Sequence, residues 1–115
     1  MSEEMRGTSR IRIHEGKLDE FLQLAAECAD IVAAREPGTV EYDFFLNREG
    51  TECFVHERFR DSAAGLEHMK NISEVMQRLS LITDMSGEVC GTPSLELREA
   101  LESAGVTIYE PRGSQ

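Results

Sequence analysis

Two β-rich runs separated by a short polar turn constrain the fold of this chain most. Residues 39–46 and 52–59 are rich in Val, Thr, Tyr and Phe, and Asn47-Arg48-Glu49-Gly50 lies between them. Asn and Gly suit the tight turn of a β-hairpin. If the turn is centred on Glu49 and Gly50, facing residues have numbers that sum to about 99.

This register assigns each side chain of the hairpin to one of two faces. The predicted pairs are Val40–Phe59, Tyr42–Glu57, Phe44–Val55 and Leu46–Cys53 on one face, and Glu41–Arg58, Asp43–His56 and Phe45–Phe54 on the other. Both charged pairs have favourable signs. Consecutive strand residues point to opposite faces, so His56 and Glu57 cannot share a site. We therefore expect His56 in an ion pair with Asp43, and Glu57 on the apolar face beneath the helices.

Strand and helix patterns flank the hairpin. Period-two alternation predicts a strand over residues 8–14. A helix over residues 17–35 is predicted by the apolar stripe Leu18, Phe21, Leu22, Ala25, Cys28, Ala29 and Val32. After the hairpin we expect helices at residues 63–71 and 73–82, a strand at 86–91, a helix at 95–103 and a strand at 106–110. Asp61 or Ser62 would cap the first of these helices and Ser94 the last.

The order of these elements indicates an α+β fold with an antiparallel sheet in the ferredoxin-like, split βαβ arrangement. We expect one compact domain in 115 residues, with a flexible N-terminus at 1–7, a ferredoxin-like core at 8–94 and a helix-strand extension at 95–115. The helices cover only one face of such a sheet, which predicts a homodimer through the other. The extension would stabilise that dimer, which we favour, cover a pocket mouth, or form a loosely packed appendage.

Composition narrows the choice of partners. The net charge of −10 disfavours nucleic acid and anionic lipid. No stretch approaches the ~20 apolar residues that cross a bilayer, and no targeting segment is recognisable at the start, so a cytoplasmic protein is expected. Three cysteines without CxxC spacing predict buried, reduced thiols.

A carboxylate, an imidazole and a phenol form the candidate site. His68 shares a helical stripe with Ala64 and Ile72 and should face the sheet, near Glu57 and Tyr42. Burial would favour a neutral Glu57, and His68 could share or accept its proton. Alternatively, the two residues only tie helix to sheet. The expected substrate-binding residues are Phe21, Phe44, Val55, Met69 and Ile72.

Metal and cofactor chemistry find no support in the residue spacing. Cys53 and Glu57 are four positions apart on one strand, roughly 13 Å, and cannot bind one ion. The chain also has no HExxH, G-x-G-x-x-G, Walker A or G-x-S-x-G pattern. We therefore predict neither a metal nor a cofactor.

The segment EPGTVEYDFFLNREGTECFVHERFRDSAAGLEHMKN, residues 36–71, resembles the antibiotic biosynthesis monooxygenase (ABM) domain family, and the resemblance extends over about residues 8–95. It implies a dimeric α+β barrel, with two sheets packed face to face and a pocket between sheet and helices. Known members include cofactor-independent monooxygenases of phenolic polyketides or quinols, and haem-degrading enzymes. By position, the matching pocket residues are Tyr42, Glu57 and His68. The chain has no tryptophan, which argues against the haem-degrading branch.

These features predict a homodimer that binds a small apolar or aromatic molecule. The leading hypothesis is a cofactor-independent monooxygenase of a phenol or quinol, in which Glu57 and His68 take the hydroxyl proton and Tyr42 orients the oxygen. A non-catalytic aromatic-ligand-binding or regulatory dimer is the alternative, and an interaction protein is a third reading.

Overall fold

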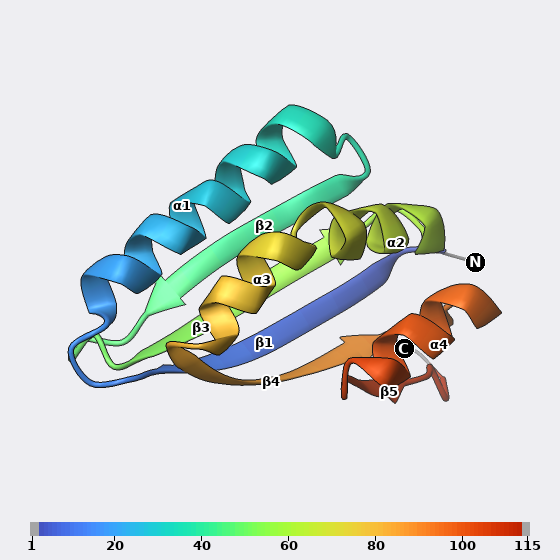
Figure 1. Cartoon of the computed structure of the whole chain (residues 1–115). Helices are drawn as coiled ribbons and strands as arrows, with labels where there is room; N and C mark the ends of the chain where they lie inside the picture. The colour runs from blue at the N-terminus through green and yellow to red at the C-terminus, as the bar shows by residue number, and fades with distance from the viewer. Residues whose placement is uncertain (1–2, 114–115) are drawn as a thin grey trace.

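A single five-stranded sheet with all four helices on one side forms the fold (Figure 1). The computed structural model describes residues 3–113. Its elements are β1 (Met5–Ile13), α1 (Leu18–Arg35), β2 (Thr39–Leu46), β3 (Glu52–Phe59), α2 (Ser62–Asn71), α3 (Ser73–Ser80), β4 (Thr83–Cys90), α4 (Leu95–Ser103) and β5 (Thr107–Tyr109). The strand order is β2-β3-β1-β4-β5, and only β5 runs parallel to its neighbour. The predicted α+β, split βαβ architecture is confirmed.

The hairpin forms in the predicted register along most of its length. Six pairs, from Glu41–Arg58 to Leu46–Cys53, match the prediction. The turn closes because the Asn47 side chain accepts backbone hydrogen bonds from Thr51 and Glu52, while Gly50 adopts a φ of 71°. The predicted pairing of Val40 with Phe59 was wrong. An irregularity between Thr39 and Glu41 pairs Thr39 with Phe59 instead.

Two strands begin earlier than their patterns indicated. β1 starts at Met5 rather than Thr8, so residues 5–7, expected in the flexible N-terminus, belong to the sheet, whereas residues 1–2 lie outside the described part. β4 starts at Thr83 rather than Ser86. In both cases pairing between strands extends the element, with Met5 opposite Phe59 and Ile13 opposite Thr83. The pattern of a single sequence segment does not contain information about such pairing with other strands.

The apolar stripe of α1 is narrower than predicted. Phe21, Leu24, Cys28 and Val32 are buried at steps of three and four residues. Leu22 and Ala29, assigned to the stripe, are exposed, and Leu24 was omitted from it. Below α1 and α3 the core is completed from the sheet by Ile11, Ile13, Cys53 and Val55.

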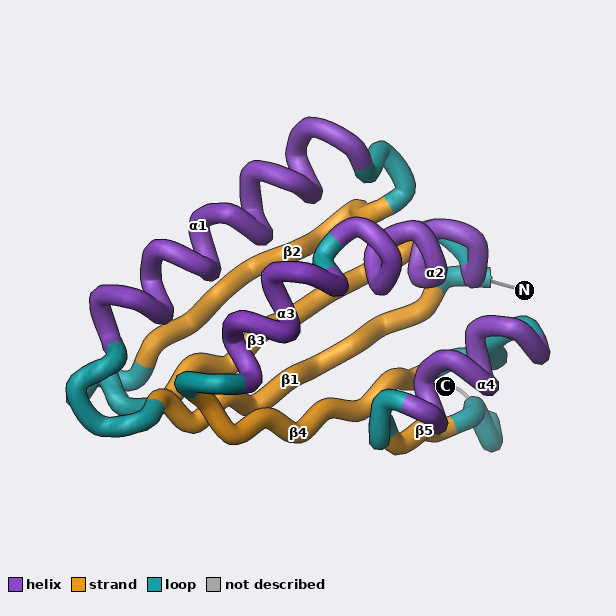
Figure 2. Tube along the Cα trace, viewed as in Figure 1, coloured by secondary structure: helices purple, strands orange, loops and turns teal. Residues whose placement is uncertain are grey.

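The last two elements pack onto their own chain. α4 contacts α2, and β5 extends the sheet beyond β4, as the ribbon and the tube both show (Figure 2). The N-cap of α4 is Ser94, as predicted, and its hydroxyl accepts a hydrogen bond from the Leu97 amide. Leu97 and Leu101 join Met5, Phe59, Ala64 and Val89 in a second core cluster. The segment 95–109 is thus an integral wall of the fold.

Candidate functional site

Glu57 lies on the helix-covered face of β3 and points toward the gap between the sheet and α2. Tyr42 faces it from β2, and Gly7 faces it from β1. A Cβ atom at position 7 would lie 3.0 Å from Glu57 Oε2, a tight contact that the carboxylate would have to relieve by a small shift. A glycine at this position therefore leaves room for the carboxylate to lie across β1.

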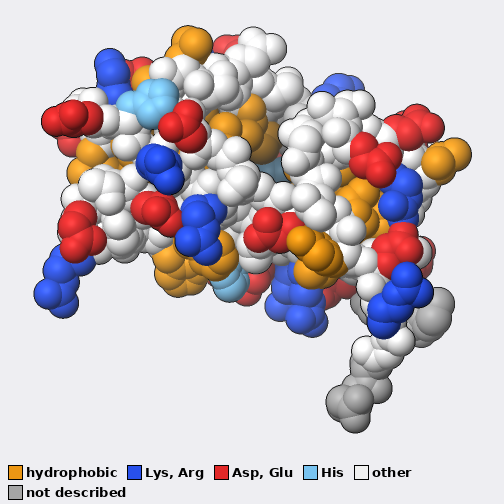
Figure 3. Space-filling view, turned by 90° about the horizontal axis from the view of Figure 1, so that it is seen from below, with side chains coloured by type: hydrophobic (Ala, Val, Ile, Leu, Met, Phe, Trp, Pro, Cys, Tyr) orange, Lys and Arg blue, Asp and Glu red, His pale blue; other side chains and the backbone are white. Residues whose placement is uncertain are grey.

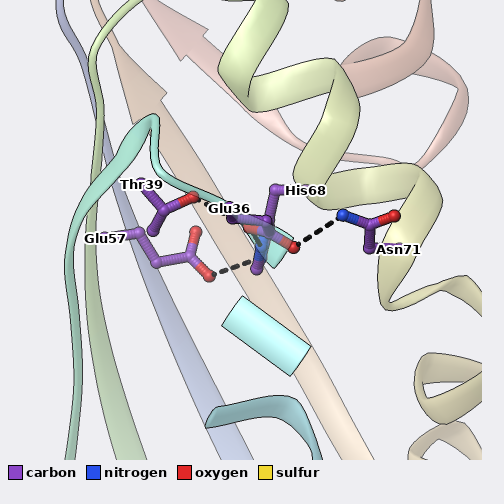
Figure 4. Close-up of polar contacts among 5 residues, drawn as sticks. All are labelled: Glu36, Thr39, Glu57, His68 and Asn71. Atoms are coloured by element: carbon purple, nitrogen blue, oxygen red, sulfur yellow. Dashed lines mark hydrogen bonds and ion pairs between the residues drawn. The ribbon is translucent and has the colours of Figure 1, made fainter. Parts of the chain in front are cut away.

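His68 lies between two carboxylates (Figure 4). Asp61 caps α2 by accepting from the Ala64 amide, and the helix then carries His68 against the sheet, where it is only 3% exposed. Its Nδ1 is 2.8 Å from Glu36 Oε1. Its Nε2 is 3.5 Å from Glu57 Oε1, the distance of an ion pair, and has no well-formed hydrogen bond to any described residue. The Nε2 atom is thus buried without a hydrogen-bond partner among these residues, which is uncommon in native proteins.

Glu36 is the site residue that the sequence analysis missed. It is 4% exposed, and its carboxylate accepts from three donors: His68 Nδ1, Thr39 Oγ1 at 2.8 Å and Asn71 Nδ2 at 3.2 Å. The hydrogen bond to Glu36 fixes the tautomer of the neutral His68 ring, because Nδ1 has to carry the proton that it donates to Glu36. Nε2 is then the nitrogen that faces Glu57. The available signal was an acidic residue at a helix C-terminus, where the helix dipole disfavours it.

The two carboxylates favour a positive charge on His68. Burial by itself disfavours the imidazolium, but the neighbouring carboxylates of Glu57 and Glu36 outweigh it. The pKa of His68 is consequently raised above its usual 6.5. Near neutral pH, His68 is therefore better suited to donate a proton, and Glu57 is the better candidate base.

Tyr42 packs against the far side of the imidazole. Its ring meets the His68 ring edge to face, with centroids 5.1 Å apart. Burial, and then the neighbouring Cys28 and Glu57, raise the pKa of the Tyr42 phenol well above its usual range. The phenol therefore stays protonated. Tyr42 supports the imidazole but does not line the pocket described next.

A pocket of about 780 Å³ opens beside Glu57 and His68. Its floor is formed by β1 and β4, and its walls by α2, α3 and the segment from α4 to Val106. The space-filling view from below shows a hollow lined by hydrophobic side chains (Figure 3). The volume is in the range of sites for small organic ligands.

The structure separates the predicted substrate-binding residues into two groups. Met69 and Ile72 line the pocket. Phe21, Phe44 and Val55 instead pack in the core between α1 and the sheet. Periodicity correctly placed these residues beneath the helices but could not locate the pocket, which lies mainly over β1 and β4 and reaches only the Glu57–Phe59 end of β3.

His56 lies on the opposite face of the sheet from Glu57, as predicted. Its expected ion pair with Asp43 is not formed among residues 3–113, although the two are register partners. The His56 ring instead contacts Phe45 and Phe54 edge to face, with centroids 5.6 and 5.1 Å away. The prediction of three buried thiols was also wrong for Cys90, which is exposed.

Residues 3–113 contain neither a metal-binding cluster nor a membrane-spanning helix. No cluster of three or more His, Cys, Asp or Glu in this range is arranged to hold a metal ion. No helix in this range has both the length and the apolar character needed to span a membrane.

Comparison with solved structures places the fold among known proteins. MupZ from Pseudomonas fluorescens is 23% identical, with a TM-score of 0.83 over 99% of this chain and 94% of its own. SnoaB from Streptomyces nogalater, a cofactor-independent oxygenase, is 18% identical, with a TM-score of 0.67 over 76% of this chain and 91% of its own. A putative antibiotic biosynthesis monooxygenase from Caulobacter crescentus is 17% identical, with a TM-score of 0.70 over 76% of this chain and 88% of its own.

Family membership follows from the sequence itself. A search of curated proteins found no match. The family model described as "Antibiotic biosynthesis monooxygenase" matches residues 8–77, more than half of the chain, from within β1 to within α3, and so includes the residues around His68. The chain belongs to the antibiotic biosynthesis monooxygenase family.

Proposed function

We propose that the protein is a cofactor-independent monooxygenase that binds a phenolic substrate with its hydroxyl group beside both Glu57 and His68. The observation that carries the proposal is the buried Nε2 of His68, which lacks a well-formed hydrogen bond beside the Glu57 carboxylate in the pocket wall. A hydroxyl group there could donate to Glu57 and accept from Nε2. The resemblance to SnoaB supports the reaction class.

The pair can act as base and acid in one cycle. Glu57 takes the phenol proton, and the phenolate then supplies electrons to O2. A C–O bond forms at the para carbon, and Glu57 returns its proton to the outer oxygen, which gives a hydroperoxide. Glu57 then removes the para hydrogen as a proton while the O–O bond breaks, and the His68 imidazolium protonates the departing hydroxide to water. Transfer of the proton from Glu57 to His68 restores the pair. The phenol and O2 thus yield a quinone and water, with no external reductant.

Oxygen uptake by the purified protein with phenols that have a free para position tests this proposal. Glu57→Gln and His68→Gln should each lower turnover by about 10²-fold or more, as expected for loss of a general acid or base. Glu67→Gln, on the exposed side of α2, and His56→Gln, on the other sheet face, are the matched controls. Uptake unaffected by the two pocket variants would contradict the assignment.

A non-catalytic ligand-binding or regulatory protein is the second candidate. The observation that favours it is the bonding of Glu36, which joins the end of α1 to Thr39, His68 and Asn71 and so has a structural use by itself. Saturable binding of phenols, without oxygen uptake or product formation, would support this candidate over the enzyme.

A further inference from the structure

The pocket continues well past Glu57 and His68 as a groove along β4. Val89 is level with Gly7 and Glu57 across the sheet, and the lining extends from Val89 to Thr83 at the other end of the strand. Six residue steps along a strand span roughly 20 Å. A single phenol ring at Glu57 would leave most of this length empty.

Methionine is the most frequent apolar residue in the lining of the groove. Four of the chain's five methionines line it: Met5, Met69, Met76 and Met85. Apart from His68, Phe59 is the one aromatic side chain lining the pocket within residues 3–113. Methionine side chains are flexible and fit irregular apolar shapes, whereas flat ring systems favour aromatic walls. This lining suits a flexible chain better than a rigid polycycle.

The C-terminal elements supply one wall of the groove. Leu97, Leu101 and residues 104–106 line it opposite α2 and α3. Leu97 packs over Gly65 on α2, where a Cβ atom would lie 3.3 Å from the leucine. The family model ends at residue 77, so this wall lies outside the matched region. The added helix and strand turn an open sheet edge into an elongated groove.

We propose that the groove binds a flexible aliphatic chain attached to the substrate's hydroxylated head. The chain lies over Gly87 and Met85, between Met76 on α3 and the turn at Val106. The proposal rests on the proposed function only for the position of the head. The assignment of the aliphatic chain depends on the lining and the length of the groove.

A series of 4-alkylphenols, from ethyl to octyl, tests the chain site without catalysis. Their para position is blocked, so the proposed oxygenation cannot occur and calorimetry measures binding alone. Each added methylene should tighten binding about three- to fourfold while it still enters the groove. 4-Octylphenol should also bind more tightly than 9-phenanthrol, a rigid phenol with the same number of carbon atoms.

Blocking the groove gives a second, independent readout. In Met85→Trp and Met76→Trp, the affinity should stop rising at a shorter alkyl chain than in the wild type. Leu81→Trp is the control, because Leu81 is exposed and outside the pocket, and it should leave the affinities of the series unchanged. The wild-type chain contains no tryptophan, so fluorescence of either pocket variant should also report the arriving chain.

Three results would overturn the groove proposal. The affinity would be independent of chain length, the rigid phenol would bind more tightly than 4-octylphenol, or the blocking variants would behave like Leu81→Trp. If the series behaves as expected while substrates with a free para position consume no oxygen, the chain site stands and the monooxygenase proposal fails. The two outcomes are therefore separable.

Discussion

At the scale of single residues, the site depends on how His68 is held. Glu36 accepts from Nδ1, which leaves Nε2 beside Glu57 and the pocket. Both carboxylates raise the pKa of the imidazole against the effect of burial. The proton on His68 is therefore coupled to the stability of the fold as well as to the proposed chemistry.

The folded protein should lose stability as pH rises above about 6.5. Since folding raises the pKa of His68 above 6.5, its contribution is fully present below that pH and is lost as pH rises through the folded pKa. Urea unfolding between pH 6 and 9 should show this decline. His68→Gln should remove it, and Glu36→Gln should reduce it because one of the two carboxylate charges is gone. An identical pH slope in wild type and His68→Gln would contradict the coupling.

Gly7 determines how the Glu57 carboxylate lies. Gly7→Ala should displace Oε2, because the new Cβ would be 3.0 Å away, and should lower the pKa of His68 measured by NMR titration. In a Glu57→Ala background the same substitution should leave that pKa unchanged, since no carboxylate remains to be moved. A full effect in that background would show that Gly7 acts through another contact.

At the scale of elements, the local patterns predicted type and order well, and tertiary pairing decided the boundaries. Asn47 and Gly50 identified the hairpin and its register. The start of β1 at Met5 depends on β3 and β4, and the pocket depends on how α4 packs over α2. Glu36 was missed for the same reason, because two of its three donors, His68 and Asn71, lie on a helix that only the fold brings to it.

The N-cap of α2 is a local feature on which the position of His68 depends. Asp61→Ala removes the side-chain acceptor for the Ala64 amide and should cost about 1 kcal/mol of unfolding free energy in urea. Asp61→Asn keeps an acceptor and should lose only a fraction of that. If both substitutions cost the same, the charge of Asp61, rather than its hydrogen bond, would be the stabilising feature.

At the scale of the whole molecule, one face of the sheet is left bare. All four helices lie on the other side (Figure 1). The bare face displays arginines on β1, carboxylates on β2 and β4, and a contact group of Phe45, Phe54 and His56, with Arg10 over the Phe54 ring at 5.4 Å. Both charge signs and an apolar centre occur on one surface, so a second copy related by twofold symmetry could complement it.

We therefore expect a homodimer through this face, detected by sedimentation at micromolar concentration. Phe45 is 55% exposed and belongs to the aromatic group, and Phe45→Asp should shift the population toward monomer by burying an unpaired charge at the interface. Leu81→Asp is the matched control, because Leu81 is 77% exposed and lies on the turn between α3 and β4. A monomeric wild type, or equal dissociation by both substitutions, would rule out this face as the interface.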